Sequence, residues 1–353
     1  MSRNDRFLSV WLFGLGLLVV VMIMVGGLTR MTQSGLSIVE WNLVTGVMPP
    51  LSEGQWQIEF AKYQQSPQFI KINHQMNRDE FKAIYWWEWG HRFLGRLIGI
   101  VYLLPLLILT MRRRLQERRM VYLWLGFGLV VVQGIVGWYM VKSGLVNDPL
   151  VSHYRLATHL FLALLLLLFL LWQWLDLNFP PLQKNLGWSL PSYLVAGLFA
   201  LIAVQMIFGA FTAGLRAGHG FNTFPKMGTE WFPYHFAAQE SWVSILIASK
   251  VGVQFVHRTL GLVIGSVAFG CWWVLIKNFK SQVARSLLHY MLLSVWIQII
   301  LGIVTLVKVV PISWASAHQW AGVNLLVSVF LLFYWLTYRE PMRDAVWAQG
   351  EPS

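Results

Sequence analysis

Charged residues are scarce in this chain, and cysteine is almost absent. Only 12% of the 353 residues are charged, whereas soluble domains carry about 25%. Because a soluble exterior needs charge, this composition argues against a soluble globular protein. The single cysteine, Cys271, lies in an apolar run. One cysteine excludes an internal disulfide, a cysteine-based zinc site and an iron–sulfur cluster.

Long apolar runs fill most of the chain instead. Hydrophobic residues make up 57% of it, and the mean hydropathy is +0.56. A membrane-spanning helix needs about 20 such residues. We therefore predict an all-α integral membrane protein with eight transmembrane helices, at approximately 8–29, 88–110, 120–141, 154–175, 190–212, 252–276, 286–308 and 316–337. The mildly basic N-terminus has no A-x-A-like cleavage site, so we expect an uncleaved first span.

Basic residues gather on alternate links between the predicted spans. The link between the second and third spans carries Arg112, Arg113, Arg114, Arg118 and Arg119. Lys277, Lys280 and Arg285 lie between the sixth and seventh spans. The positive-inside rule makes both links cytoplasmic, so both termini are also cytoplasmic, and segments 30–87 and 213–251 face outward.

The formal net charge of +12 is explained by this topology. The basic clusters are expected to lie beside anionic membrane lipid, and we expect no nucleic-acid partner. Nothing at the N-terminus resembles an Arg- and Ser-rich organelle transit peptide. We therefore expect a multi-pass protein of a bacterial inner membrane.

The chain divides into two similar halves. His91–Gly99 (HRFLGRLIG) returns as His257–Gly265 (HRTLGLVIG). The Gln-x-x-x-Gly motif of the third span (133–137) returns in the seventh (298–302), and the GGLT of 26–29 returns as the GAFT of 209–212. Each half has an even number of spans, which predicts a parallel repeat. We expect two four-helix bundles, residues 1–180 and 181–353.

Four histidines occupy equivalent places in these halves. His91, His159, His257 and His318 each lie at or near the start of an even-numbered span. All four should therefore lie at a similar depth in the outer half of the membrane. A single histidine there is more often an interfacial anchor, but four at repeat-related positions favour ligation of a metal or haem iron.

Haem is favoured over a bare metal ion. A zinc or di-metal site needs cysteine or carboxylate ligands close by, and the predicted bundle interiors contain no second carboxylate. Two imidazoles from facing helices suit the two axial positions of haem iron. Small residues in these helices suit either a nearby flat macrocycle or helix–helix packing, and both readings stay open: Gly95, Gly99, Gly134, Gly137, Gly261, Gly265 and Gly302.

The remaining histidines are expected to make ordinary surface or interfacial hydrogen bonds: His74, His153, His219, His235 and His289. One carboxylate distinguishes the two halves. Glu88 precedes His91 by one turn, whereas Gln254 holds the equivalent place before His257. Because positions i and i+3 share a helix face, we expect Glu88 to point toward the pocket of His91. The alternative is an interfacial carboxylate at a helix start.

Together these features resemble the haem A synthase family over essentially the whole chain. The resemblance depends on the eight spans, the four-plus-four repeat and four motifs: Glu-x-x-His-Arg at 88–92, RLATHL at 155–160, His257-Arg258 and Ala317-His318. Some members carry cysteine pairs in outer loops. This chain has none, so it is more similar to the cysteine-poor proteobacterial and mitochondrial branch.

The resemblance implies an oxidoreductase that converts a methyl substituent of haem O to a formyl group, giving haem A for terminal cytochrome oxidases. It implies that His91 and His159 hold the substrate haem and form, with Glu88, the catalytic set. His257 and His318 would hold a resident haem b that moves electrons. A carboxylate beside the reacting haem suits this reaction, because oxidising a methyl group releases protons.

Arginines beside these histidines are candidate partners for haem propionates, because arginine pairs well with carboxylates. They are Arg92, Arg155 and Arg258, and each also suits an interfacial anchor. Haem O synthase and cytochrome oxidase assembly factors are the candidate protein partners. Two other functions stay open: a non-enzymatic membrane dihaem electron carrier and a haem carrier.

Overall fold

Helices make up most of the part of the chain that the structure describes. The computed structural model describes residues 3–41, 45–113, 115–145, 151–182, 189–233, 241–279 and 281–339. Within these residues the elements are α1 Arg3–Met31, η1 Thr45–Val47, α2 Glu53–Gln64, α3 Pro67–Lys71, α4 Arg78–Met111, α5 Glu117–Gly144, α6 His153–Asn178, α7 Leu190–Gly214, η2 Ala217–His219, α8 Trp242–Ala248, α9 Lys250–Leu275, α10 Gln282–Val307 and α11 Ile312–Tyr338.

The prediction of an all-α membrane protein with eight spans is confirmed. In the described part of the chain, eight helices are long and apolar enough to cross a membrane: α1, α4, α5, α6, α7, α9, α10 and α11. Of the predicted starts, that of the second span differs most. It begins at Arg78 rather than near 88, because Asn77 and Glu80 form a capping box there.

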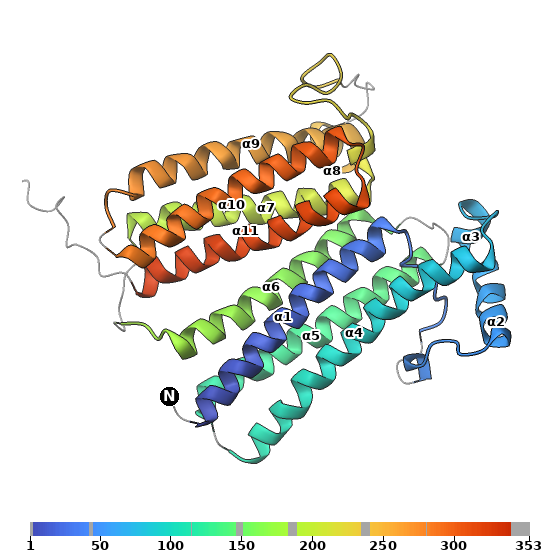
Figure 1. Ribbon diagram of the computed structural model, residues 1–353, viewed down its shortest axis with the longest axis horizontal. Helices are drawn as coiled ribbons and strands as arrows, with labels where there is room; N and C mark the ends of the chain where they lie inside the picture. The colour runs from blue at the N-terminus through green and yellow to red at the C-terminus, as the bar shows by residue number, and fades with distance from the viewer. Residues whose placement is uncertain are drawn as a thin grey trace, which may run out of the picture.

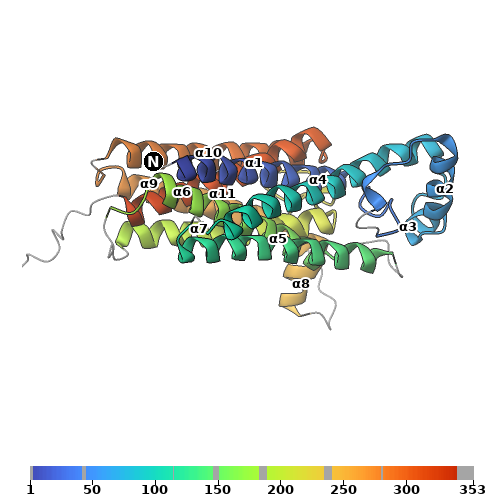
Figure 2. The same ribbon diagram turned by 90° about the horizontal axis from the view of Figure 1, so that it is seen from below.

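The 34 residues of α4 exceed the length that a bilayer requires, so its first turns extend beyond the other helices. Figures 1 and 2 show α2 and α3 packed beside this extension at one end of the molecule. A buried aromatic cluster joins them to it, made of Trp56, Tyr63, Phe81 and Tyr85 with Ile38. We call this end of the bundle the α2 end.

The long helices form two groups of four that lie side by side (Figure 1). One group contains α1, α4, α5 and α6, and the other contains α7, α9, α10 and α11. One apolar core extends through both groups, from Leu15 and Leu106 in the first to Leu198 and Val329 in the second. The structure does not test the division of the chain at residue 180, which stays a prediction.

The same local contacts recur at matching places in the two groups. Thr29 Oγ1 donates to the Val25 carbonyl and Thr212 Oγ1 to the Phe208 carbonyl, both over 2.8 Å. The turn after each of these helices then contains a non-glycine residue in the left-handed region, Gln33 with φ 58° and Arg216 with φ 52°. Such residues are uncommon, so α1 and α7 end in the same way.

The first helix is also bonded to the second group. Arg30, near the end of α1, donates through Nη2 to the carbonyls of Ala213 at 3.1 Å and Gly214 at 2.6 Å. These carbonyls belong to the last turn of α7, where helical partners are lacking and a cation is favoured. The α2 ends of α1 and α7 are therefore held together.

Candidate functional site

The four predicted histidines lie in two pairs, one in each group of helices. His91 on α4 faces His159 on α6, and His257 on α9 faces His318 on α11, close enough within each pair to interact electrostatically. All four side chains are half-buried. The rings of His257 and His318 have centroids 6.2 Å apart and planes at 88° to each other.

Each histidine ring lies directly against a glycine of a neighbouring helix. A methyl group at Gly26 of α1 would lie 3.2 Å from His91 Nε2, and one at Gly137 of α5 would lie 3.0 Å from His159 Cε1. The second group repeats this arrangement: the corresponding distances are 3.3 Å from Gly209 to His257 Cε1 and 2.8 Å from Gly302 to His318 Cε1.

Of the glycines that the sequence singled out, some contact a histidine ring and others do not. Gly137 and Gly302 lie on histidine rings, whereas Gly95 contacts Met22, Gly261 contacts Gln205 and Gly265 contacts Ile299. Gly99 and Gly134 have nothing within 4 Å of an added methyl group. Sequence reasoning missed Gly26 and Gly209 as site residues, although their repeated motif gave a signal.

Glutamines support the helices at the level of the histidines. Gln133 Nε2 donates to the His159 carbonyl and Gln205 Nε2 to the His257 carbonyl, both over 2.9 Å. Gln298 Nε2 lies 3.5 Å from His318 Nε2. The two carbonyl bonds join neighbouring helices at the turns that carry His159 and His257.

The residues present fit a haem with two histidine ligands. Two metal–nitrogen bonds of about 2 Å, and about 1 Å from each nitrogen to its ring centre, span about 6 Å, which matches the separation of His257 and His318. The Nδ1 atoms of His159, His257 and His318 are buried without a hydrogen-bond partner. Among the described residues, no three metal-ligating side chains cluster as a bare metal ion would require.

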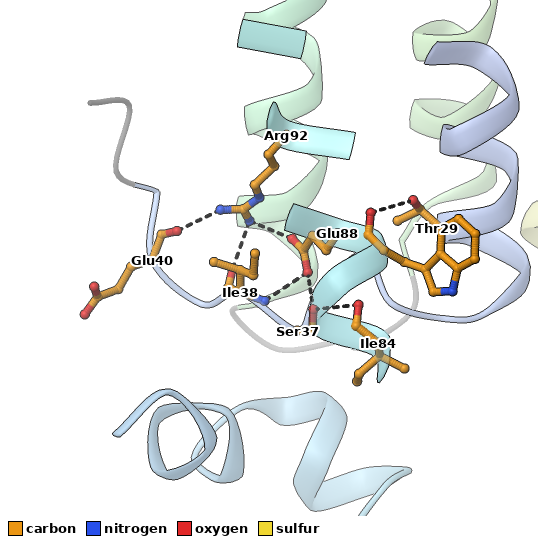
Figure 3. A network of polar contacts seen from close by, with 8 residues as sticks. Thr29, Ser37, Ile38, Glu40, Ile84, Glu88 and Arg92 are labelled. Carbon is orange, nitrogen blue, oxygen red and sulfur yellow. Dashed lines mark hydrogen bonds and ion pairs between the residues drawn. The ribbon is translucent and has the colours of Figure 1, made fainter. Parts of the chain in front are cut away.

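Glu88 is the centre of a buried polar network on α4 (Figure 3). Its Oε2 accepts hydrogen bonds from Ser37 Oγ at 2.7 Å and from the Ile38 amide at 2.9 Å. Its Oε1 forms an ion pair with Arg92 Nη2 at 2.7 Å. These described partners lie on the segment after α1 and on α4 itself, so the carboxylate ties that segment to the helix that carries His91.

Gln254 holds the equivalent position on α9, but it donates a hydrogen bond where Glu88 accepts one. Its Nε2 donates to the Phe221 carbonyl at 3.0 Å, where Glu88 accepts from the Ile38 amide. In both halves the residue one turn before the histidine therefore binds the backbone of the segment that follows α1 or α7. Of these two residues, only Glu88 carries a formal charge.

The three predicted propionate partners have different surroundings. Arg92 is bonded to Glu88 and to the carbonyls of Ile38 and Glu40. Arg155 lies over the ring of Tyr139, with its guanidinium carbon 4.7 Å from the ring centroid.

Arg258 donates through Nη2 to the Thr223 carbonyl, while its Nε and Nη1 are buried without a partner. Two unpartnered nitrogens on this half-buried guanidinium suit an anionic group. Of the three arginines, Arg258 is therefore the best placed to bind a propionate.

Most of the other histidines lie away from the two pairs. His153 opens α6, and its Nε2 lies 3.1 Å from the Ile247 carbonyl. His289 accepts a hydrogen bond from Trp272 Nε1. His74 and His219 are exposed, and His235 lies outside the described residues.

The chain is similar to known proteins over nearly its whole length. The model of the COX15-CtaA family, described as cytochrome oxidase assembly protein, matches residues 9–330. Heme A synthase of Wolbachia pipientis wMel is 41% identical over 94% of this chain and 92% of its own length. The heme A synthases of Parvibaculum lavamentivorans and Maricaulis maris are 41% and 40% identical, over 93% and 96% of this chain and 93% and 98% of their own lengths.

Proposed function

The chain belongs to the COX15-CtaA family of cytochrome oxidase assembly proteins, the haem A synthases, and we propose that it oxidises a methyl substituent of haem O to the formyl group of haem A. One observation carries this proposal. Each group of four helices presents two facing histidines, and each of the four rings lies against a glycine. Two equivalent sites suit one substrate haem and one resident haem.

His257 and His318 would hold the resident haem b, with Arg258 at a propionate. Their ring separation of 6.2 Å leaves room for one iron, and Arg258 has buried nitrogens without partners. Haem b, when bound, supplies one-electron redox chemistry. The glycine contacts limit where the two rings can lie, and Gln205 holds the backbone of α9 at His257.

His91 and His159 would hold haem O, next to the carboxylate that the second half lacks. An ionised carboxylate has about four acceptor positions, and Ser37, Ile38 and Arg92 occupy three of those of Glu88. In this proposal the remaining position accepts a proton, or holds a water, as the substrate methyl is oxidised. Arg92 holds the carboxylate in place through their 2.7 Å ion pair.

The protein would act in a bacterial inner membrane with both termini in the cytoplasm. The Arg112–Arg119 link supports this orientation through the positive-inside rule. The α2 end and both histidine pairs would then lie toward the outer side of the membrane. Haem O synthase, which would supply the substrate, and cytochrome oxidase assembly factors are the proposed protein partners.

Co-expression with a haem O synthase, in a bacterial host that makes no haem A, tests this function. Extracted haems are separated by chromatography and identified by mass. We expect haem A with the parental chain and only haem O with the His91→Ala and His159→Ala variants. A haem-loaded parental chain that never yields haem A would instead support a dihaem electron carrier or a haem carrier.

A further inference from the structure

A polar side chain joins the two groups of helices beside the second histidine pair. Gln319 follows His318 on α11 and is half-buried. Its Nε2 donates to the carbonyl of Ile23 on α1 at 2.8 Å. Polar side chains within spanning helices are costly and are usually retained for a function.

The amide of Gln319 lies directly on the backbone of α1 at Gly27. A methyl group added there would overlap the amide carbon, oxygen and nitrogen of Gln319. A larger residue at this position would displace the amide from its place beside the Ile23 carbonyl. The bond therefore depends on one residue from each group.

The preceding residue of α1 belongs to the first histidine pair. Gly26 lies against the ring of His91, so α1 contacts both sites within two consecutive residues. A short connected series results: His318 is covalently joined to Gln319, Gln319 is bonded to α1, and α1 packs on His91. Contiguous contacts of this kind are one route by which two sites can be coupled, and a measured coupling is needed to establish it.

The contact between α6 and α7, which also joins the two groups, lacks this connection. Leu160 follows His159 as Gln319 follows His318, and Ala210 occupies the place on α7 that Gly27 holds on α1. Leu160 packs in an apolar cluster that includes Ala210. An apolar contact at the equivalent place, between Leu160 and the cluster that contains Ala210, is therefore compatible with this fold. The polar contact occurs between α11 and α1.

We propose that Gln319 is a positioning residue that couples the two histidine pairs. Through it, occupancy of the His91–His159 site changes the midpoint potential of a haem at the His257–His318 site. This inference depends on the proposed function, because it requires both pairs to bind a porphyrin. Coupling of this kind is reciprocal: each ligand changes the affinity for the other by the same factor.

A redox measurement on the purified haem-b-loaded protein tests the coupling. Gallium(III) protoporphyrin, which does not change oxidation state in this range, is bound at the first pair, and its loading is followed by absorbance. The midpoint potential of the haem at the second pair is measured with and without it. We expect a shift in the parental protein.

Three variants separate the hydrogen bond from simple packing. Gln319→Met keeps the size of the side chain but lacks the donor, and Gly27→Ala keeps the donor but displaces it. The double variant Gly27→Ala/Gln319→Leu reproduces the residue types found at Ala210 and Leu160. We expect each to retain haem b and to show less than half of the parental shift, whereas the control Leu160→Met shows all of it.

Several results would overturn the coupling. One is a parental protein that shows no shift, and another is a Gln319→Met or double variant that keeps the full shift. Loss of haem b from all three variants would make Gln319 a structural part of the second pocket only. If the parental protein forms haem A while the shift is absent, the coupling fails and the proposed function stands.

Discussion

Glu88 and Arg92 form a buried ion pair on one face of α4, with 2.7 Å between Oε1 and Nη2 and side chains only 3% and 8% exposed. Glu88 also accepts hydrogen bonds from the Ser37 hydroxyl and the Ile38 amide, and Arg92 donates to the Ile38 and Glu40 carbonyls. The pair therefore fixes segment 37–40 on the helix that carries His91. A positioning role and a chemical role for Glu88 make different predictions.

Glu88→Gln tests the chemical role. The amide keeps the size of the side chain but cannot accept a proton, and a positioned base contributes about 10²- to 10⁴-fold to a rate. We expect the variant to retain haem b and to lose haem A formation by a factor in this range. Gln254→Glu is the matched control and should create no activity in the second half. Haem A formed at the parental rate by Glu88→Gln would exclude a role in proton transfer.

The positioning role predicts a loss of local stability. Removing one partner of a buried ion pair leaves an uncompensated charge and costs about 3–5 kcal/mol. Glu88→Ala or Arg92→Ala should therefore increase hydrogen exchange at residues 36–41 in detergent. The double variant should be less affected than the sum of the single variants, because it leaves no unpaired charge. Additive effects would show that the two residues do not act together.

Replacing the second histidine pair should remove the resident haem. His257→Ala and His318→Ala should lose the haem b absorbance of the purified protein, because each removes a residue that would hold the haem iron. His91→Ala and His159→Ala should keep most of it. Unchanged haem content in the first two variants would contradict the assignment of haem b to this pair.

The glycine contacts predict a graded effect on haem binding. Gly302→Ala places a methyl group 2.8 Å from His318 Cε1, which forces the ring or the helix to move. We expect the ratio of haem to protein to fall at least several-fold. Gly99→Ala, with nothing within 4 Å, is the control and should match the parental ratio. Equal ratios in both variants would assign these glycines to helix packing alone.

The orientation in the membrane is open to a direct test with reporter fusions. A fusion after Gln116 should report a cytoplasmic location, because five arginines surround this link. A fusion after Gln65, between α2 and α3, should report an external location. The opposite pattern would place the α2 end and both histidine pairs toward the cytoplasm.

The eight spans and the two histidine pairs could be predicted because each depends on patterns within a short stretch of sequence. Apolar length alone identifies a spanning helix, and the repeated HRxLG motif places His91 and His257 at equivalent positions. The surroundings of Glu88 were less accessible. Its spacing from His91 predicts a shared helix face, but its described partners Ser37 and Ile38 come from a segment about 50 residues earlier.

The bond of Gln319 to Ile23 shows the same limit more strongly, because the two residues are 296 positions apart in the sequence. No periodicity in α1 or α11 indicates which turns meet. The glycine contacts lie between these extremes. For Gly137 and Gly302 the sequence left open both a nearby macrocycle and helix packing, whereas Gly26 and Gly209 were recognised only as parts of a repeated motif.

The contacts of α1 also have a consequence for how the protein is made. Arg30 binds the last turn of α7, and the Ile23 carbonyl accepts its hydrogen bond from α11. In the described part of the chain, α1 is thus bonded to the fifth and the eighth of the spanning helices. Arg30 gains its α7 partners only after residue 214 has been translated, and the Ile23 carbonyl gains the Gln319 amide only after residue 319. The bonds that join α1 to the second group therefore form late, after more than half of the chain has been made.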